Sequence, residues 1–81
     1  MGNIIEKTPK FLNALKHIKD KNFKIKIWKQ TEKIIKNPET GKPMMYERKG
    51  TREVRIPPFR ISYAYIDNKI IFLDLYHKDE Q

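Results

Sequence analysis

The apolar residues of this chain change their spacing near residue 50, and that change limits the folds that the chain can adopt. Before the proline- and glycine-containing stretch 37–50, apolar side chains recur at helical intervals, and after it they alternate at every second position. Helices and strands that are segregated in this way along a chain are typical of α+β folds. We therefore predict a helical hairpin packed on one face of a mainly antiparallel sheet. A length of 81 residues predicts a single domain over residues 1–81.

The first twenty residues predict a short strand and a helix. Residues 3–7 are a short run that contains apolar side chains, and we predict a first strand there. Thr8 can cap a helix that begins at Pro9, because threonine accepts from free amides and proline is tolerated in the first helical turn. One face of that helix carries Phe11, Leu12, Leu15 and Ile18. We interpret residues 20–22 as a tight connection.

The next segment fits two patterns. Phe23, Ile25 and Ile27 alternate as in a strand. A longer helical stripe includes Phe23, Ile27, Trp28, Thr31, Ile34 and Ile35. Because the longer pattern carries more weight, we predict a helix that continues to about Lys36. The pair Asn37-Pro38 ends it, since a residue before proline resists the helical conformation.

The C-terminal part predicts three strands after a loop at 37–50. The first covers residues 51–57 and is interrupted by Pro57-Pro58, which cannot donate to a sheet ladder. The second covers residues 59–66. Asp67-Asn68 then suits a hairpin turn, because both residue types tolerate positive φ. The third strand, residues 69–76, is the most apolar, and we expect it to be central and covered on both faces.

The charge is strongly positive and unevenly distributed. Lys plus Arg total 18 against 10 Asp plus Glu, a net charge of +8. Residues 7–36 contain ten lysines, which we interpret first as a solvated helix face, whereas residues 42–60 are richer in arginine. Arginine has a planar fork that binds phosphate or carboxylate in a bidentate manner. The excess charge favours a polyanionic partner.

Several classes of protein are excluded. Cysteine is absent, so disulfides, thiol nucleophiles and thiolate metal sites are absent as well. The longest apolar run, residues 70–73, is too short to cross a bilayer, and the N-terminus does not resemble a signal peptide, so we expect a soluble cytoplasmic protein. His17 and His77 are the only imidazoles and lie in separate elements, so we expect no metal and no cofactor.

One concentrated polar set remains as a candidate site. Lys49, Arg52, Arg55 and Arg60 lie on or beside two adjoining predicted strands, and His77-Lys78 follows the last strand. Cations can stabilise the charge that grows on phosphorus, and an imidazole can take a proton from a ribose 2′-hydroxyl. Arg52 and Arg55 are an odd number of positions apart, so an ideal strand places them on opposite faces unless a bulge intervenes.

The segment from Lys49 to Tyr63 resembles the RelE/ParE superfamily of toxins. Members typically show a basic strand, a bend, an aromatic-Arg-apolar-x-Tyr motif and an apolar strand that ends in a His-basic pair. In this chain the corresponding pieces are Phe59-Arg60-Ile61-Ser62-Tyr63, Ile70 to Leu75 and His77-Lys78, and Asn37-Pro38 also recurs in the family. The resemblance covers about residues 8–78 and implies a β-α-α-β-β-β fold, in agreement with the patterns above.

The resemblance also implies a function and roles for individual residues. RelE-like members cleave mRNA in the ribosomal A site, which implies an mRNA endoribonuclease that inhibits translation and needs no metal. Arg60 and Arg55 would then grip the scissile phosphate, His77 would be the general base and Lys78 would stabilise the transition state. RNA binding would fall on Lys49, Arg52 and Arg48.

Departures from the family pattern leave alternatives open. Glu53 stands where many relatives carry Arg or Lys, and the tyrosine that several members carry after the basic pair is absent. A ParE-like poison of DNA gyrase and a non-catalytic nucleic-acid-binding module are the competing functions. We further expect an acidic, partly helical antitoxin that folds on binding, because Phe59, Tyr63 and the basic strands should be partly open.

Overall fold

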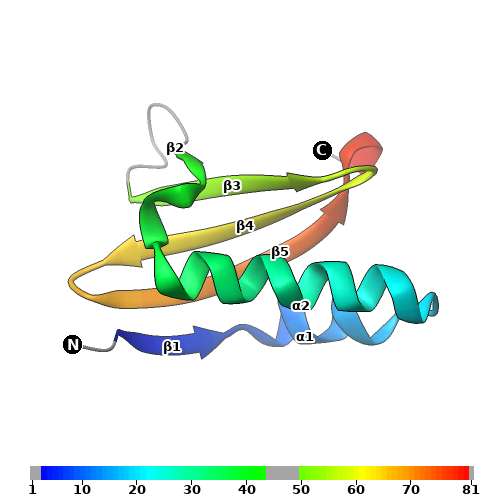
Figure 1. The fold of residues 1–81 in the computed structure, drawn as a ribbon, viewed down its shortest axis with the longest axis horizontal. Coiled ribbons are helices and arrows are strands. Elements are labelled where there is room, and N and C mark those ends of the chain that lie inside the picture. Colours follow the sequence, from blue (N-terminus) through cyan, green and yellow to red (C-terminus); the bar gives the residue numbers. More distant parts are fainter. Residues whose placement is uncertain (1–2, 44–49, 81) are drawn as a thin grey trace.

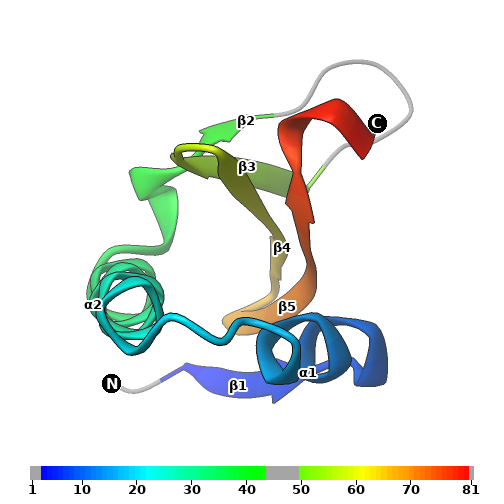
Figure 2. The same cartoon turned by 90° about the vertical axis from the view of Figure 1, so that its right-hand side faces the viewer.

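The computed structural model describes residues 3–43 and 50–80, which form two helices on one face of a five-stranded sheet (Figures 1 and 2). The sheet has the order β1-β5-β4-β3-β2; β1 runs parallel to β5 and all other neighbours are antiparallel. The predicted α+β fold is confirmed. In chain order the elements are β1 (Ile4–Lys7), α1 (Pro9–Lys16), α2 (Lys21–Lys36), the 3-10 helix η1 (Pro38–Thr40), β2 (Lys42–Pro43), β3 (Thr51–Ile56), β4 (Phe59–Ile66), β5 (Lys69–His77) and the 3-10 helix η3 (Lys78–Glu80).

Side-chain caps decide where the two helices begin. The Thr8 hydroxyl accepts from the Phe11 amide at 3.1 Å, as predicted for the start of α1. Asp20 caps α2 by accepting from the amides of Asn22 and Phe23. The helix therefore begins at Lys21, inside the stretch predicted as a connection. The helical interpretation of the ambiguous segment is confirmed.

The stretch predicted as a loop contains two short elements. Asn37 ends α2, and its side chain accepts from the Glu39 amide and so caps η1. Strand β2 follows and pairs with Arg52 and Glu53 of β3. Later in the chain, the turn between β4 and β5 has positive φ at Asp67 and Asn68, as the sequence predicts.

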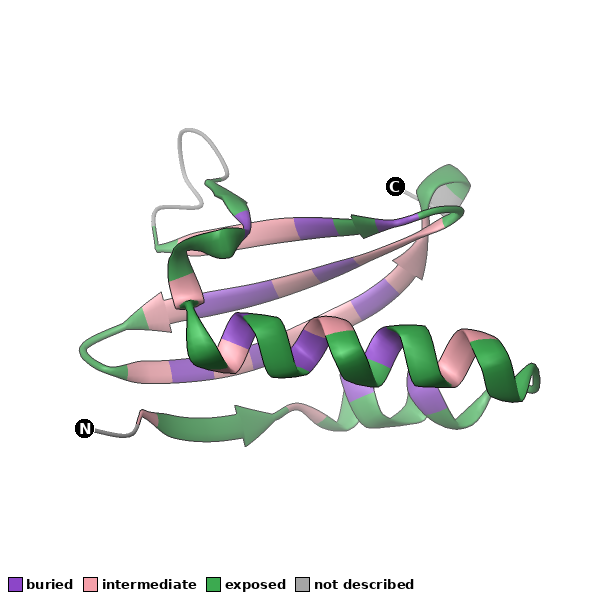
Figure 3. Ribbon diagram, in the orientation of Figure 1, coloured by how far each residue is buried: buried purple, intermediate pink, exposed green. Residues whose placement is uncertain are grey.

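The core lies between the helices and one face of the sheet (Figure 3). Its largest fully buried side chains are Tyr63, Phe11, Phe72, Ile27, Ile34, Ile61 and Ile70. The sequence predicts a partly open Tyr63, and the structure corrects this, because Tyr63 is 0% exposed. Two residues assigned to the core stripes, Leu12 and Trp28, are exposed instead. The Lys7 ammonium lies 5.2 Å from the centre of the Trp28 ring, so the indole packs against a cation at the surface.

A bulge in β5 keeps the apolar side chains before and after it on the buried face of the sheet. Ser62 pairs with Asp74 and Tyr63 pairs with Phe72, so Leu73 is the extra residue. Because the bulge shifts the alternation by one, Leu75 joins Phe72 on the buried face. Strand β5 lies between β1 and β4, but Leu73 is only half-buried, so the expectation of full cover on both faces is wrong there.

Among the helices that the structure describes, none has the length and apolar content needed to cross a membrane.

Candidate functional site

The sheet face that points away from the helices, here called the outer face, carries a cluster of charged side chains. Directly paired residues of antiparallel strands share a face. Arg55 pairs with Arg60, and Glu53 pairs with Ser62, whereas the intervening Val54 is buried in the core. Arg55, Arg60 and Glu53 therefore lie together on the outer face.

Glu53 is the centre of this cluster. The Arg60 Nη1 atom lies 3.4 Å from the Glu53 Oε1 atom, and the Tyr76 hydroxyl donates to the other carboxylate oxygen. The Arg60 and Glu53 side chains are only 22% and 14% exposed. A partly buried carboxylate with two donors is held in one orientation, because each oxygen has its own partner. Glu53 and Tyr76 were not among the site residues that the sequence predicted.

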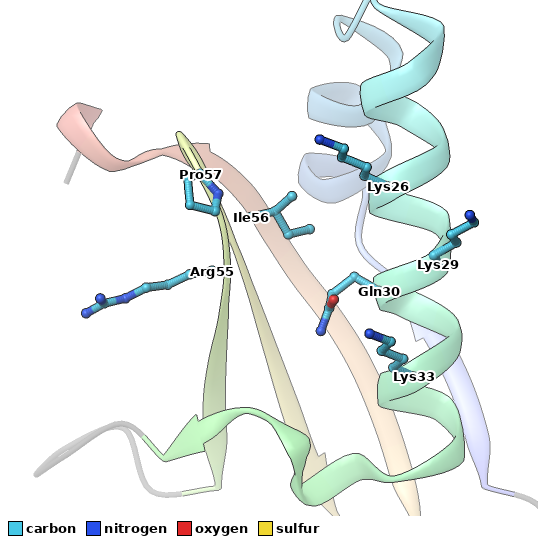
Figure 4. Close-up of a pocket in the computed structure, with 7 residues that line it drawn as sticks. All are labelled: Lys26, Lys29, Gln30, Lys33, Arg55, Ile56 and Pro57. Atoms are coloured by element: carbon cyan, nitrogen blue, oxygen red, sulfur yellow. The ribbon is translucent and has the colours of Figure 1, made fainter.

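Arg55 stands beside this network with an exposed side chain. Its guanidinium points away from α2 (Figure 4). Within residues 3–43 and 50–80, no acidic group pairs with it. An exposed guanidinium without an internal carboxylate can bind a phosphate at little desolvation cost.

Arg52 lies on the opposite face and has a structural role. It pairs with Tyr63, whose side chain is in the core. Its Nη1 atom donates to the carbonyl oxygens of Gly41 at 2.8 Å and Glu39 at 3.1 Å. The bulge that could have turned it outward is in β5, so Arg52 stays on the helix side, away from Arg55.

Tyr63 bonds the same short segment, residues 38–41, that Arg52 bonds. Its hydroxyl donates to the Pro38 carbonyl at 2.7 Å and accepts from the Gly41 amide at 2.8 Å. Burial raises the pKa of the Tyr63 phenol, and the Gly41 amide and the Arg52 charge oppose that rise. The tyrosine of the aromatic-Arg motif therefore joins η1 and β2 to the sheet instead of lining the outer face.

His77 also lies on the helix side. It pairs with Phe59, and the two rings meet edge to face with centroids 5.4 Å apart. Phe59 in turn packs against Phe23 of α2. The His77 Nδ1 atom lies 3.2 Å from the Asp79 amide nitrogen and 3.6 Å from the Asp79 carboxylate. Register thus separates His77 from the arginines of the outer face.

The other predicted site residues have different positions. The Lys78 amide donates to the Pro58 carbonyl at 2.9 Å, which holds the start of η3 against the bend between β3 and β4. The Lys78 side chain is exposed. Arg48 and Lys49 lie outside the described residues.

The spacing of the sequence contained a signal for Glu53. It is two positions before Arg55, so a strand places both on one face. Tyr76 could not be found in this way, because its position beside Arg60 depends on the register of β4 and β5.

Comparison with known proteins identifies the family. The family model described as the ParE toxin of type II toxin–antitoxin systems, parDE, matches residues 5–81. A search of curated protein sequences finds no significant match.

Several solved toxin structures share the fold. The RelBE2 toxin–antitoxin complex of Mycobacterium tuberculosis superposes with a TM-score of 0.79 at 18% identity, covering 96% of this chain and 100% of that chain. A mutant of Escherichia coli RelE in the free state gives a TM-score of 0.80 at 9% identity, covering 100% of this chain and 88% of that one. The YoeB dimer of Staphylococcus aureus gives 0.77 at 22% identity, covering 95% and 99%.

Proposed function

The chain belongs to the ParE toxin family of type II toxin–antitoxin systems, within the RelE/ParE superfamily, and on that premise we propose that it is a toxin that cleaves mRNA at the ribosome and acts in the cytoplasm. The observation that carries the nuclease proposal is the cluster of Arg55, Arg60, Glu53 and Tyr76 on the outer face of the sheet. It combines cations, a carboxylate and a hydroxyl, which are the groups that metal-independent phosphodiester cleavage requires.

The proposed reaction uses the 2′-hydroxyl of the RNA as nucleophile. The Glu53 carboxylate takes the proton of that hydroxyl, and the 2′-oxygen attacks the adjacent phosphorus while the bond from phosphorus to the 5′-oxygen breaks. The leaving 5′-oxygen takes a proton from the Tyr76 hydroxyl or from water. Arg55 and Arg60 stabilise the added charge on the phosphate oxygens. Lys78 adds positive charge at the same end of the sheet.

Register leads us to assign the base to Glu53 rather than to His77. Glu53 shares a face with both arginines, whereas the His77 ring packs on Phe59 on the helix side. A general base must come within hydrogen-bond reach of the proton that it abstracts, and geometry takes precedence over intrinsic basicity.

Single substitutions test this assignment in a translation reaction programmed with a defined mRNA. Arg55→Ala and Glu53→Gln should each lower the rate of transcript cleavage by about 100-fold or more, the loss typical for a group that stabilises the transition state. His77→Ala should leave cleavage within a few fold of the wild type. Lys16→Ala, at an exposed lysine on α1, is the matched control. Loss of cleavage in His77→Ala alone would move the base back to the imidazole.

The partner that we propose is an acidic antitoxin. RelB accompanies the toxins of two neighbouring structures, from Escherichia coli and Methanococcus jannaschii, and DinJ accompanies YafQ in a third. A net charge of +8 favours an acidic protein as the counterpart of this chain.

Gyrase poisoning is the second candidate, because the matching family model is that of the ParE toxin. Under this alternative the outer arginines bind a protein and not a phosphate. Induced expression followed by a supercoiling assay separates the two functions. We expect translation to stop, with cut transcripts, while plasmid supercoiling is unchanged. Loss of supercoiling with intact transcripts would favour the gyrase target.

A further inference from the structure

The outer face carries a second row of polar side chains beside the arginines. Glu53 pairs with Ser62 across β3 and β4, and Ser62 pairs with Asp74 across β4 and β5. Ile61 and Leu75, which alternate with Ser62 and Asp74 along their strands, are buried in the core, so Ser62 and Asp74 lie on the outer face. Glu53, Ser62 and Asp74 therefore form one row across three strands.

The Asp74 carboxylate at the end of this row is partly buried and retains the capacity to accept hydrogen bonds. Its side chain is 22% exposed. The Oδ1 atom accepts from the Leu75 amide at 2.8 Å, and the Oδ2 atom lies 3.5 Å from the ammonium group of Lys10. A carboxylate has about four lone-pair sites, so each oxygen can accept one further hydrogen bond. Two adjacent N–H donors of a ligand fit such a group.

Lys10 places a hydrogen-bond donor beside that carboxylate. It belongs to the first turn of α1, which packs beside β5 (Figure 2), and its side chain is 77% exposed. The two residues therefore offer two acceptor positions on Asp74 and a donor on Lys10 side by side. A ligand edge that carries two adjacent donors next to an acceptor complements this arrangement.

Among the four RNA bases, guanine is the one that has this edge. Its Watson–Crick edge presents N1–H and the N2 amino group beside the O6 acceptor, whereas adenine and cytosine place a ring-nitrogen acceptor next to their amino group. Uracil has a single donor between two acceptors. Because a carboxylate repels an acceptor that faces it, the Asp74–Lys10 pair favours guanine over the other three bases.

From these observations we infer that Asp74 and Lys10 recognise a guanine base in the nucleotide on the 5′ side of the cleaved bond. This inference rests on the proposed function, because it places the 2′-hydroxyl of that nucleotide at Glu53. Two strand spacings of about 4.8 Å each separate Glu53 from Asp74, so the two residues lie about 10 Å apart. A purine nucleoside spans a distance of that order between its 2′-oxygen and a hydrogen-bonded partner at its Watson–Crick edge, with the base over the small side chain of Ser62.

Binding of 3′-mononucleotides tests the inference without a ribosome, because the 3′-phosphate can bind Arg55 and Arg60 while the base reaches Asp74. By isothermal titration calorimetry, we expect 3′-GMP to bind the wild type about tenfold or more tightly than 3′-AMP, the discrimination typical of one bidentate base contact. Asp74→Asn keeps an oxygen for the Leu75 amide but replaces the second acceptor with a donor, so the preference should fall to about twofold or less.

Two further variants keep the test decisive. Lys10→Ala changes a side chain that is 77% exposed, so the core is left intact, and it should lower the preference for 3′-GMP by about threefold because O6 loses its donor. Asp67→Asn is the matched control for charge. It removes one carboxylate from an exposed turn residue at positive φ, which asparagine tolerates, and should keep the full preference.

Equal affinity of the wild type for 3′-GMP and 3′-AMP, or no binding of 3′-GMP at millimolar concentration, would overturn the guanine site. A preference that survives both Asp74→Asn and Lys10→Ala would overturn the role of these two residues. Cleavage of a reporter mRNA with G or A before the cleaved bond separates this inference from the proposed function. Selective binding of 3′-GMP by a protein that cuts no transcript would contradict the nuclease alone, whereas equal cleavage after G and A together with equal binding would contradict the guanine site alone.

Discussion

Tyr63 shows how one side chain can hold together segments that are distant in the sequence. Its hydroxyl bonds the Pro38 carbonyl and the Gly41 amide, and Arg52 donates to two carbonyls of the same bend. The bend directs the chain from the end of α2 into β2. The tyrosine that ends the aromatic-Arg motif therefore has a buried, structural position in this protein.

The variant Tyr63→Phe tests the contribution of that hydroxyl. It leaves the buried Gly41 amide without its acceptor, so we expect a loss of about 1–3 kcal/mol in the free energy of unfolding at neutral pH. Because burial raises the Tyr63 pKa, the folded protein keeps the proton at a pH where the unfolded chain releases it. The Tyr63 hydroxyl makes its full contribution to the free energy of unfolding below about pH 10, and this contribution is lost as the pH rises towards the raised pKa.

Urea denaturation of both proteins between neutral pH and about pH 11 measures this effect. The difference in stability between wild type and Tyr63→Phe should shrink at the alkaline end. Since both proteins share the same lysines, their titration cancels in the comparison. A difference that stays constant with pH would contradict the assigned cause.

Gly41 is closely enclosed by the side chains of Tyr63 and Arg52. A Cβ atom added there would lie 2.6 Å from the Tyr63 hydroxyl and 3.0 Å from the Arg52 Cβ atom. Gly41→Ala should therefore lower the free energy of unfolding by about 1–3 kcal/mol through overpacking. Thermal denaturation measures the change. The same substitution is also made in the Tyr63→Phe background, which lacks the hydroxyl. If Gly41→Ala is equally destabilising in both backgrounds, the added methyl group does not act by displacing the Tyr63 hydroxyl.

At the scale of elements, Thr8 couples β1, α1 and β5. Its amide donates to the Phe72 carbonyl, its hydroxyl donates to the Leu73 carbonyl at 2.7 Å, and the same hydroxyl accepts from the Phe11 amide. The carbonyl that it reaches belongs to the bulge residue of β5. The cap of a helix and the bulge of a strand are therefore stabilised by one side chain.

Thr8→Ala should cost about 1–2 kcal/mol, because it removes the helix cap and also leaves the bulge carbonyl without its donor. Asp20→Ala, which removes only the cap of α2, should cost less. Thr40→Ala changes an exposed threonine and serves as the control. Chemical denaturation ranks the three variants, and a Thr8→Ala cost no greater than that of Asp20→Ala would show that the bulge contact adds nothing.

At the scale of the whole molecule, a net charge of +8 on 81 residues places many like charges near one another. Among the described residues, three ion pairs join a lysine or arginine to an acidic residue, and the lysine side chains of Lys10–Asp74 and Lys69–Glu6 are 77% and 41% exposed. Surface pairs of that kind contribute little to stability. Self-repulsion therefore opposes folding and is reduced by salt.

Added salt should raise the melting temperature by a few degrees between about 20 mM and about 300 mM NaCl, as the screening length shortens. The variant Lys16→Gln/Lys19→Gln removes two positive charges, from +8 to +6, and should show a smaller increase. Differential scanning calorimetry measures both. A melting temperature that falls with salt would mean that the ion pairs outweigh the repulsion.

The sequence alone determined the kind and approximate place of the two long helices and of strands β1, β3, β4 and β5, but not of η1 and β2. Apolar periodicity, the cap at Thr8 and the Asp67-Asn68 turn act over a few residues, so they can be interpreted without knowing what packs against them. The sequence also predicts that Arg55 and Arg60 lie near each other, since they flank one tight bend.

Only the tertiary structure decided which side chains meet. The bulge at Leu73 sets the faces of β5, so it brings Tyr76 to Glu53 on the outer face and turns His77 towards Phe59 on the other. Arg52, for which the family resemblance predicts an RNA contact, donates to the carbonyls of Glu39 and Gly41 on the helix side of the sheet. Strand register is set by contacts between segments far apart in the chain, and a shift of one residue reverses every face; for that reason local pattern identifies the charged residues of a strand but not the site that they form.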